Sequence, residues 1–233
     1  MNDWYVIRSG AAESDWNMAL DEALLQQAPR LGRPVLRFYA WREPAATFGF
    51  FQSYDEVARW TPLRPLIRRP TGGGLVPHAA DWTYSVAIPP SDPWYTLAAR
   101  DSYLRLHQWL MAAFASLRLA TGLCPEKRPI LPGQCFAGAE QFDLLRNERK
   151  LAGAAQRRSR TALLIQGSIQ PPPDDITRTD FEASLLDTAR QLWQVRWTAW
   201  EPDAPLLACA TELVTSKYSQ DPYNQKRRPA GIA

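Results

Sequence analysis

Residues 141–169 constrain the fold most, because they hold three strand-like segments joined by two short polar turns. The segments are 141–146, 150–157 and 161–169, and the turns are 147–148 and 158–160. Neighbours this close can be joined only as hairpins, because parallel strands need a crossover of a dozen or more residues. The sequence therefore predicts a three-stranded antiparallel meander in this part of the chain.

Other parts of the chain predict further strands and helices. Alternating apolar and aromatic positions are typical of strands, and apolar positions at helical spacing are typical of helices. Pro29 is expected to end the first helix. The expected strands are 35–41, 46–51, 66–69 and 81–88, and the expected helices are 16–27, 96–119 and 180–192. Strands and helices mixed without regular βαβ alternation indicate an α+β fold.

The chain has 233 residues, enough for one large domain with a proper core. We expect a single domain over residues 1–233. The proline loop at 171–173 marks where a small C-terminal subdomain over residues 174–233 could separate. The polar, proline-bearing tail at 225–233 is expected to fray.

The charge balance and the apolar pattern argue against two classes of protein. Lys and Arg number 27 against 24 Asp and Glu, whereas a dedicated nucleic-acid binder concentrates far more positive charge on one face. No apolar run approaches the ~18 residues that a membrane span needs, and the N-terminus lacks the layout of a secretory signal. We expect a cytoplasmic protein that binds neither nucleic acid nor a membrane.

The cysteines and histidines do not form a metal-binding pattern. Cys124, Cys135 and Cys209 have no CxxC spacing, so neither a zinc ribbon nor a disulfide scaffold is indicated. A histidine zinc site would need both His78 and His107, the only two histidines. His107 lies within a helical pattern and is expected to be a helix-surface or packing residue. No metal ligand is predicted.

The sharpest local feature is the glycine turn, residues 68–74, which reads Arg-Arg-Pro-Thr-Gly-Gly-Gly and is followed by His78. Successive glycines let the backbone approach a ligand closely and expose N–H groups that can bind an anion. The arginines can pair with phosphate or carboxylate. The alternative is a flexible hairpin turn with solvated arginines, and the residues alone do not decide between the two.

A second feature combines a thiol with a cationic strand. Cys135 follows a loop, and Lys150 begins the segment Lys-Leu-Ala-Gly-Ala-Ala-Gln-Arg. A thiol becomes a nucleophile when it is partly exposed near positive charge, but a lone cysteine is also a common small buried residue. Gly153 within a strand indicates a bulge or the close approach of another group to the backbone. The residues alone predict no more than an anion pocket near a thiol.

Together, and in this order, the two features resemble the lipoate–protein ligase A and octanoyltransferase family. The family pattern is Arg-Arg, a Gly-rich turn and a His, then Lys-x-x-Gly-x-Ala. Further stretches that agree with the family are Ser9-Gly10, 17–25, 36–41, 83–86, 167–169, Lys217-Tyr218 and Asn224. The similarity extends over residues 4–224, and it is closest to the cysteine-dependent octanoyltransferases.

This resemblance implies the catalytic-domain fold shared with biotin–protein ligases, a mixed and largely antiparallel sheet with packed helices. It also implies one cleft between the glycine turn and the lysine strand, with Lys150 at the polar head of the acyl group. Cys135 and Lys150 would be catalytic. The residues expected to bind substrate are Arg69, Thr71, Gly72, Gly73, Gly74, His78, Tyr84, Gly153, Ala155 and Gln156.

The resemblance favours a transferase over a ligase. Family transferases form an acyl thioester on a cysteine in a Cys-Phe context, and Cys135-Phe136 stands at that place before Lys150. Such an enzyme would need no cofactor. Its donor would be an octanoyl- or lipoyl-acyl carrier protein, and its acceptor a lysine of a lipoyl domain or of a glycine-cleavage H-type protein. A ligase would instead activate free lipoate with ATP and Mg.

Three positions depart from the transferase pattern. Gly74 stands where transferases have a bulkier residue, Ala79 replaces an acidic residue after the histidine, and Gln166 replaces a histidine before Gly-Ser-Ile. The third change removes an acid–base or hydrogen-bonding group from the expected cleft wall. Three hypotheses follow: an octanoyltransferase, an ATP-dependent lipoate–protein ligase, and a non-catalytic relative that binds an acyl group or a partner.

Overall fold

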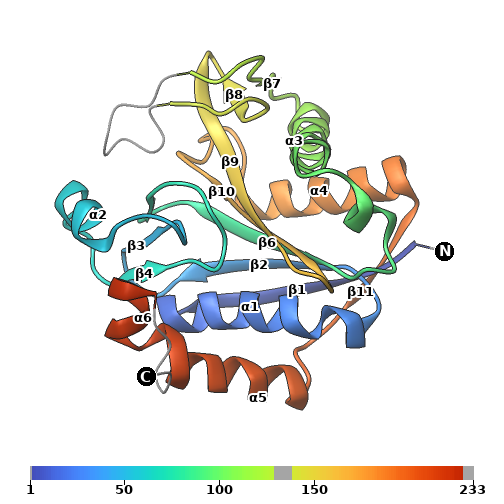
Figure 1. Ribbon diagram of the computed structural model, residues 1–233. Coiled ribbons are helices and arrows are strands. Elements are labelled where there is room, and N and C mark those ends of the chain that lie inside the picture. Colours follow the sequence, from blue (N-terminus) through green and yellow to red (C-terminus); the bar gives the residue numbers. More distant parts are fainter. Residues whose placement is uncertain (1, 129–137, 228–233) are drawn as a thin grey trace.

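A large mixed sheet organises the chain, which the computed structural model describes at residues 2–128 and 138–227 (Figure 1). Its eight strands lie in the order β11-β1-β2-β6-β10-β9-β8-β7. β1 pairs in parallel with β2 and β11, whereas the other neighbours pair antiparallel. The strands are β1 (Asn2–Ala12), β2 (Val35–Trp41), β6 (Trp82–Ile88), β7 (Gly122–Leu123), β8 (Leu144–Arg146), β9 (Arg149–Arg158), β10 (Leu163–Ile169) and β11 (Val195–Ala199). The fold is α+β with a largely antiparallel sheet, as predicted.

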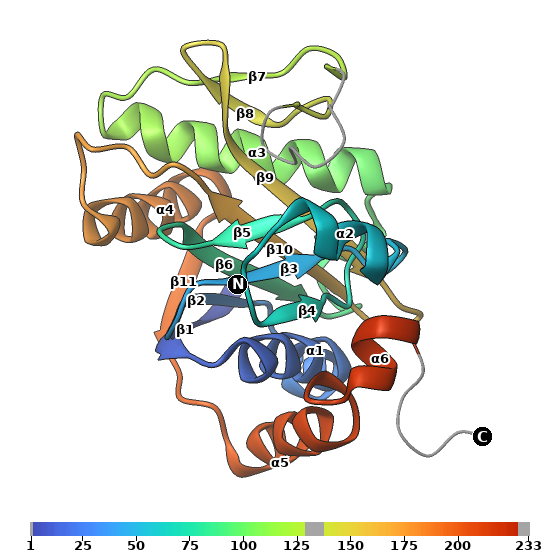
Figure 2. The ribbon, with the colours of Figure 1, turned by 90° about the vertical axis from the view of Figure 1, so that its left-hand side faces the viewer.

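Helices cover both faces of the sheet. α1 and α5 lie against one face, and α3 and α4 lie against the other (Figures 1 and 2). The helical elements are α1 (Ser14–Leu31), α2 (Tyr54–Trp60), η1 (Pro93–Thr96), α3 (Ala99–Ser116), α4 (Arg178–Trp193), α5 (Ala204–Leu213), η2 (Val214–Tyr218) and α6 (Asp221–Lys226).

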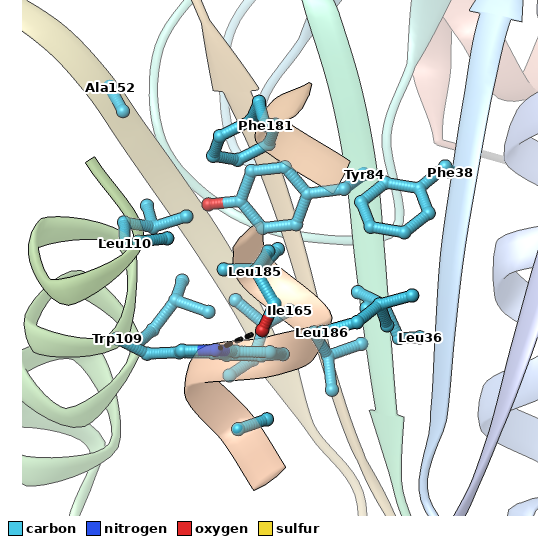
Figure 3. Packing of buried hydrophobic residues seen from close by; sticks show 14 of the residues in the cluster. Leu36, Phe38, Tyr84, Trp109, Leu110, Ala152, Ile165, Phe181, Leu185 and Leu186 are labelled. Atoms are coloured by element: carbon cyan, nitrogen blue, oxygen red, sulfur yellow. Dashed lines mark hydrogen bonds between the residues drawn. The ribbon is translucent and has the colours of Figure 1, made fainter. Parts of the chain in front are cut away.

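The alternation of β6 shows how the two faces divide. Tyr84 and Val86 point into the main core with α3 and α4, whereas Ser85 points to α1 and donates to Asp21 at 2.7 Å. Figure 3 shows Tyr84 packed among Phe181, Leu110 and neighbouring side chains of this core. The Trp109 indole N–H donates to the Leu185 carbonyl at 2.9 Å and so ties α3 to α4 (Figure 3). The face of the sheet that α1 covers therefore carries polar groups as well as apolar ones.

A small second sheet supports the glycine turn. Its strands are β3 (Ala45–Phe48), β4 (Leu66–Arg68) and β5 (Val76–His78), in the order β4-β3-β5. β3 pairs in parallel with β4 and antiparallel with β5. The glycine turn joins the two outer strands, so this sheet fixes where the turn lies.

The predicted meander is confirmed as β8, β9 and β10. Its first turn is the two-residue hairpin Asn147-Glu148, and both residues have positive φ, 49° and 60°. Turns of that conformation match the twist of the strands they join. The expected strand at 35–41 is present with the predicted bounds, and the strands at 46–51, 66–69 and 81–88 and the helices at 96–119 and 180–192 are present with shifted ends.

Other expectations about local structure were wrong or incomplete. α1 starts at Ser14 and continues through Pro29 to Leu31, where Gly32 ends it in a left-handed conformation and donates to the Ala28 carbonyl. A proline this close to the end removes only one helical hydrogen bond. The sequence did not predict β1, β5, β7, β11, α2, α5 or α6, and the last two residues of α6, 225–226, belong to the tail expected to fray.

Residues after the proline loop contribute to the same layers as the rest of the chain. β11 pairs with β1, and α4 packs against α3. That the whole chain behaves as a single domain, without a separate C-terminal subdomain, stays a prediction. Within the described residues, no helix has the length and apolar character needed to cross a membrane.

Candidate active site

A cavity of about 150 Å³ lies on the α1 face of the sheet, between the glycine turn and strands β2, β9 and β10. It receives seven of the residues predicted from the sequence, namely Arg69, Gly73, Gly74, His78, Lys150, Gly153 and Ala155. The structure therefore brings the glycine turn and the lysine strand to one cavity, although about 80 residues separate them in the sequence.

Four predicted residues do not line this cavity. Thr71 is buried and Gly72 is half-buried, and neither lines the cavity. Tyr84 points to the opposite face of the sheet, into the core shown in Figure 3. Gln156 lines a neighbouring surface depression and donates to the Ala99 carbonyl at 2.7 Å. Cys135 lies outside the described residues.

A β-bulge turns Lys150 towards the cavity. Leu145 pairs with Lys150 and Leu144 pairs with Ala152, so Leu151 is an extra residue on β9. Leu151 and Ala152 both join the main core, and the alternation of β9 is reversed at that point. Lys150 consequently shares the cavity face with Gly153.

Lys150 is held by a buried carboxylate. Its ammonium lies 2.7 Å from Asp143 Oδ2, with the lysine side chain 11% and the aspartate side chain 0% exposed. Asp143 also accepts hydrogen bonds from the Tyr103 hydroxyl and from the Glu140 backbone N–H. A Cβ on Gly153 would lie 2.6 Å from Lys150 Cε, so only glycine leaves room for the lysine side chain.

The glycine turn lies very close to the backbone at Gly49 and to strand β9 on the other side of the cavity. Gly73 has a φ of +85°, which glycine adopts readily. A Cβ on Gly49 would lie 1.9 Å from the Gly73 carbonyl oxygen, so two chain segments touch there without side chains between them. A Cβ on Gly73 would lie 3.5 Å from Ala155 Cβ on β9. Small residues on both sides thus keep the cavity open and narrow.

The two arginines that begin the glycine turn are buried and hydrogen-bonded to the protein rather than solvated. Arg68 is buried and donates to the carbonyls of residues 223–225 and to those of Phe50 and Gln52. Arg69 donates to the carbonyls of Gly72 and Gly74 and to the Thr47 hydroxyl. Their main role in the structure is to hold the turn in shape, an alternative that the sequence did not suggest.

His78 belongs to a buried chain of hydrogen bonds along the cavity wall. Its Nδ1–H donates to Asp81 Oδ2 at 2.9 Å, because a carboxylate can only accept, and its Nε2 lies 2.8 Å from Thr47 Oγ1. Burial lowers the pKa of His78, although Asp81 opposes that shift. The imidazole is therefore neutral, and the Thr47 hydroxyl donates to its Nε2. Trp41 stacks on the ring with centroids 3.9 Å apart.

Asp81 supplies the acidic partner that Ala79 does not. Burial alone would raise its pKa, but His78 and the hydroxyls of Ser168 and Thr83 outweigh burial, and the pKa is lowered. The carboxylate is thus ionised and fixes the orientation of His78. The missing acidic residue next to the histidine is replaced by one three positions along the chain.

Gln166 also keeps a hydrogen-bonding group in the cavity wall. Its amide N–H donates to Asp21 Oδ2 at 2.8 Å, and its carbonyl oxygen accepts from the Thr71 hydroxyl at 2.8 Å. Asp21 is in turn paired with Arg37 at 2.7 Å, and both side chains are fully buried. The change from histidine therefore removes an ionisable group and retains a structural link from the turn to the sheet.

The remaining cavity wall is mostly apolar. Met18, Tyr39, Trp41, Leu75 and Val76 line it, and the first two are 1% exposed. A largely apolar cavity with cationic side chains in its lining suits a short hydrocarbon chain that carries an oxygen-bearing head. In the part of the chain that the structure describes, no group of three or more His, Cys, Asp or Glu side chains is arranged to bind a metal ion.

Sequence reasoning missed Asp143, Tyr103, Asp21 and Thr47. Asp143 falls within the expected strand 141–146, where nothing distinguishes it from a solvent-facing residue, and Tyr103 reads as one apolar position of a helix. Asp81 carried a detectable signal, because it follows the motif histidine by three residues. His107 is a fully buried packing residue of α3, in line with expectation.

Comparison with known protein families gives a match to the lipoyl protein ligase A/B catalytic domain over residues 13–185. Octanoyltransferase LipM of Lysinibacillus sphaericus is 32% identical over 182 residues, which cover 72% of this chain and 66% of that protein. LipM of Staphylococcus aureus is 34% identical over 180 residues, covering 71% and 65%. The chain thus spans slightly less than two thirds of the length of these relatives. LipM of an Exiguobacterium species is 33% identical over 208 residues, covering 84% and 75%.

Solved structures share the fold. The putative lipoate protein ligase Ta0514 of T. acidophilum superposes with a TM-score of 0.80 at 19% identity, covering 96% of this chain and 99% of that one. A lipoate-protein ligase A bound with ATP gives 0.78 at 19% identity, covering 97% and 99%. At such identity the likeness concerns the backbone architecture alone.

Proposed function

The chain belongs to the lipoyl protein ligase A/B catalytic-domain family, and from this premise we propose that it is an octanoyltransferase of protein lipoylation. The observation that carries the proposal is that Lys150 lines a largely apolar cavity bounded by the glycine turn. The relatives at 32–34% identity carry the name octanoyltransferase LipM, which supports the same activity. An octanoyl or lipoyl group is the substrate class that fits the cavity.

In the first half-reaction, the Cys135 thiolate attacks the carbonyl carbon of an acyl thioester. The new carbon–sulfur bond forms, the donor carbon–sulfur bond breaks, and the donor leaves as a thiolate that takes up a proton. The result is an octanoyl thioester on Cys135. A cysteine is suited to this step because its thiolate is both a good nucleophile and a good leaving group.

In the second half-reaction, the amine of an acceptor lysine attacks the Cys135 thioester. An amide bond forms, the amine loses a proton, and the cysteine leaves as a thiolate. Lys150 would donate a hydrogen bond to the acyl oxygen in both steps, which stabilises the negative charge that develops there. The apolar wall would exclude water from the thioester and limit its hydrolysis.

The proposed partners follow from this chemistry. The donor is an octanoyl-acyl carrier protein, whose thioester supplies the energy, so no ATP or metal is required. The acceptor is a lysine of a lipoyl domain or of a glycine-cleavage H-type protein. One solved structure of the same fold belongs to an archaeal lipoylation system that consists of a bipartite lipoate protein ligase and its E2 lipoyl domain. This pairing supports a lipoyl domain as the acceptor.

Intact mass spectrometry tests the proposal directly. The protein is incubated with octanoyl-acyl carrier protein, and the mass of one octanoyl group should be added to it. Addition of a lipoyl-domain acceptor should then remove that mass from the enzyme and place it on the acceptor. Absence of both products, with a positive control enzyme active in parallel, would refute the transferase proposal.

The second candidate is an ATP-dependent lipoate–protein ligase, favoured by the glycine at position 74 that lines the cavity. A ligase must form an acyl-adenylate, whose phosphate charge needs neutralisation by Mg. ATP consumption with free lipoate and a lipoyl-domain acceptor separates the two activities. Lipoylation that depends on ATP would establish the ligase. If neither activity is detected, the hypothesis of a non-catalytic binding relative remains.

A further inference from the structure

We propose that Asp143 is a positioning residue for Lys150, and that Tyr103 fixes Asp143 in turn, so that the lysine ammonium is aimed at the acyl oxygen. This inference rests on the proposed acyl transfer and adds two residues to its machinery. Neither residue belongs to the motifs that define the cavity in the sequence. Tyr103 lines the cavity from α3, and Asp143 contacts Lys150 from the loop before β8.

The contacts of Asp143 account for both of its oxygens. Oδ2 lies 2.7 Å from the Lys150 ammonium and accepts from the Glu140 backbone N–H at 2.7 Å. Oδ1 accepts from the Tyr103 hydroxyl. A carboxylate with three donors around it cannot rotate without losing one of them, so its position is determined from three elements of the chain.

Tyr103 connects this carboxylate to the strand that carries the lysine. Its hydroxyl oxygen accepts from the Ala154 backbone N–H at 3.2 Å while the hydroxyl donates to Asp143. Burial is the main cause of a raised pKa for Tyr103, and Asp143 raises it further, so the hydroxyl keeps its proton at neutral pH. Tyr103 thus acts as a donor to Asp143 and as a spacer from β9.

The backbone of β9 limits where the lysine side chain can go. Without a Cβ at Gly153, the Lys150 side chain can lie across the strand, with Nζ 2.8 Å and Asp143 Oδ1 3.1 Å from where that Cβ would be. The bulge at Leu151 turns the side chain to this face. The glycine leaves space for the lysine side chain, the bulge sets its direction, and Asp143 holds its ammonium group.

Burial makes this arrangement consequential. The Asp143 side chain is fully buried and that of Lys150 nearly so. Removing one member of such a pair leaves a buried charge without its counter-ion, which is costly and drives rearrangement. An ammonium has three N–H donors, and the direction of the first towards Asp143 restricts the directions available to the other two. A displaced ammonium would still be present but would not meet the acyl oxygen.

The test measures octanoyl transfer by three single variants, Asp143→Asn, Tyr103→Phe and Lys150→Ala. It also measures transfer by the double variant that combines Asp143→Asn with Lys150→Ala. We expect Asp143→Asn to lower kcat by about 10- to 150-fold, the loss typical of a misplaced charged donor, with little change in KM. Tyr103→Phe, which removes a single hydroxyl, should lower kcat by about 3- to 10-fold. Glu182→Gln is the matched control, because Glu182 is also a buried acid in ion pairs but lies on α4.

The double variant separates positioning from a general structural effect. If Asp143 acts through Lys150, Asp143→Asn should cause no further loss of kcat in the Lys150→Ala background. A multiplied loss there, a change in KM alone, or wild-type kcat for both Asp143→Asn and Tyr103→Phe would overturn the inference. Transfer by the wild-type protein reports on the proposed function separately, since a wild-type protein without transfer refutes that function and this inference with it.

Discussion

The Thr71 hydroxyl donates to the side-chain oxygen of Gln166 at 2.8 Å and so joins the glycine turn to β10, across 95 residues of sequence. The amide N–H of the same glutamine reaches the buried Asp21. Gln166 is thus a neutral connector between the turn and the sheet. A histidine at that position could change its charge with pH, whereas the glutamine keeps position 166 uncharged over the whole physiological range.

The first prediction concerns the nucleophile. Cys135→Ser should abolish or strongly slow acyl transfer and give no acyl-enzyme in an intact-mass measurement. Cys124→Ser and Cys209→Ser should have little effect, because Cys124 is buried away from the cavity and Cys209 lies on α5. Undiminished transfer by Cys135→Ser would end the thioester mechanism and favour the ligase.

The second prediction concerns Lys150. Lys150→Ala should lose about 10- to 150-fold in kcat, because a charged donor to the acyl oxygen is removed. Lys150→Arg should restore activity only in part, since the guanidinium is larger and planar. Arg149→Ala is the control, because Arg149 is the adjacent but exposed cation of β9. Steady-state transfer assays measure all three, and wild-type turnover by Lys150→Ala would show the cavity assignment to be wrong.

The third prediction is a pH dependence of stability that arises from His107. Burial lowers its pKa to about 4, against an ordinary value of about 6.5. The unfolded state therefore binds the proton first, and stability falls as the pH drops from about 6.5 to about 4, by roughly 3 kcal/mol. Urea unfolding across this range should show that His107→Leu loses this part of the pH dependence. Parallel curves for the variant and the wild type would contradict it.

The fourth prediction concerns acyl-chain length. Met18 is a buried apolar residue of the cavity, in contact with Gln166. Met18→Ala should lengthen the slot and raise the preference for decanoyl over octanoyl donors by about 10-fold, because one or two methylenes in an apolar pocket are worth about 1–3 kcal/mol. Leu25→Ala is the control, being buried on the same helix in a different cluster. The ratio of kcat/KM values decides, and an equal ratio in both variants would exclude this role.

The fifth prediction concerns domain organisation. The residues after the proline loop supply β11 and α4, which pair with β1 and α3. We therefore expect one cooperative unfolding transition for the whole chain. Tryptophan fluorescence and far-UV circular dichroism should give coincident urea curves. Two separated transitions would instead support a C-terminal subdomain.

Local patterns predicted the parts of the fold that depend on neighbours in sequence. The β8–β9–β10 meander follows from two short turns, and the expected close approach at Gly153 is confirmed by the Lys150 side chain that lies over it. The parallel pairing of β1 with β2 and β11 was not predictable in this way. β11 lies almost 200 residues after β1, and α1 separates β2 from β1, so no local signal reports either contact.

The residues of the candidate site also fall into those that a local motif predicts and those that only the fold brings together. Its glycines, His78 and Lys150 stand in recognisable motifs, whereas Asp143 and Tyr103 are ordinary residues until the fold brings them to the lysine. Tyr84 shows the opposite case. It lies within a stretch that resembles the family pattern, yet the pleat of β6 directs it to the far face of the sheet.

The hydrogen bonds of Arg68 have a consequence for the synthesis of the protein on the ribosome. Arg68 directly precedes Arg69, which holds the glycine turn, and several of its acceptors lie 155 to 157 residues further along the chain. A nascent chain emerges from its N-terminus, so these carbonyls become available only after nearly all other elements have been made. The hydrogen bonds that anchor Arg68 at the start of the turn therefore form late, after the strands and helices that line the cavity have been made.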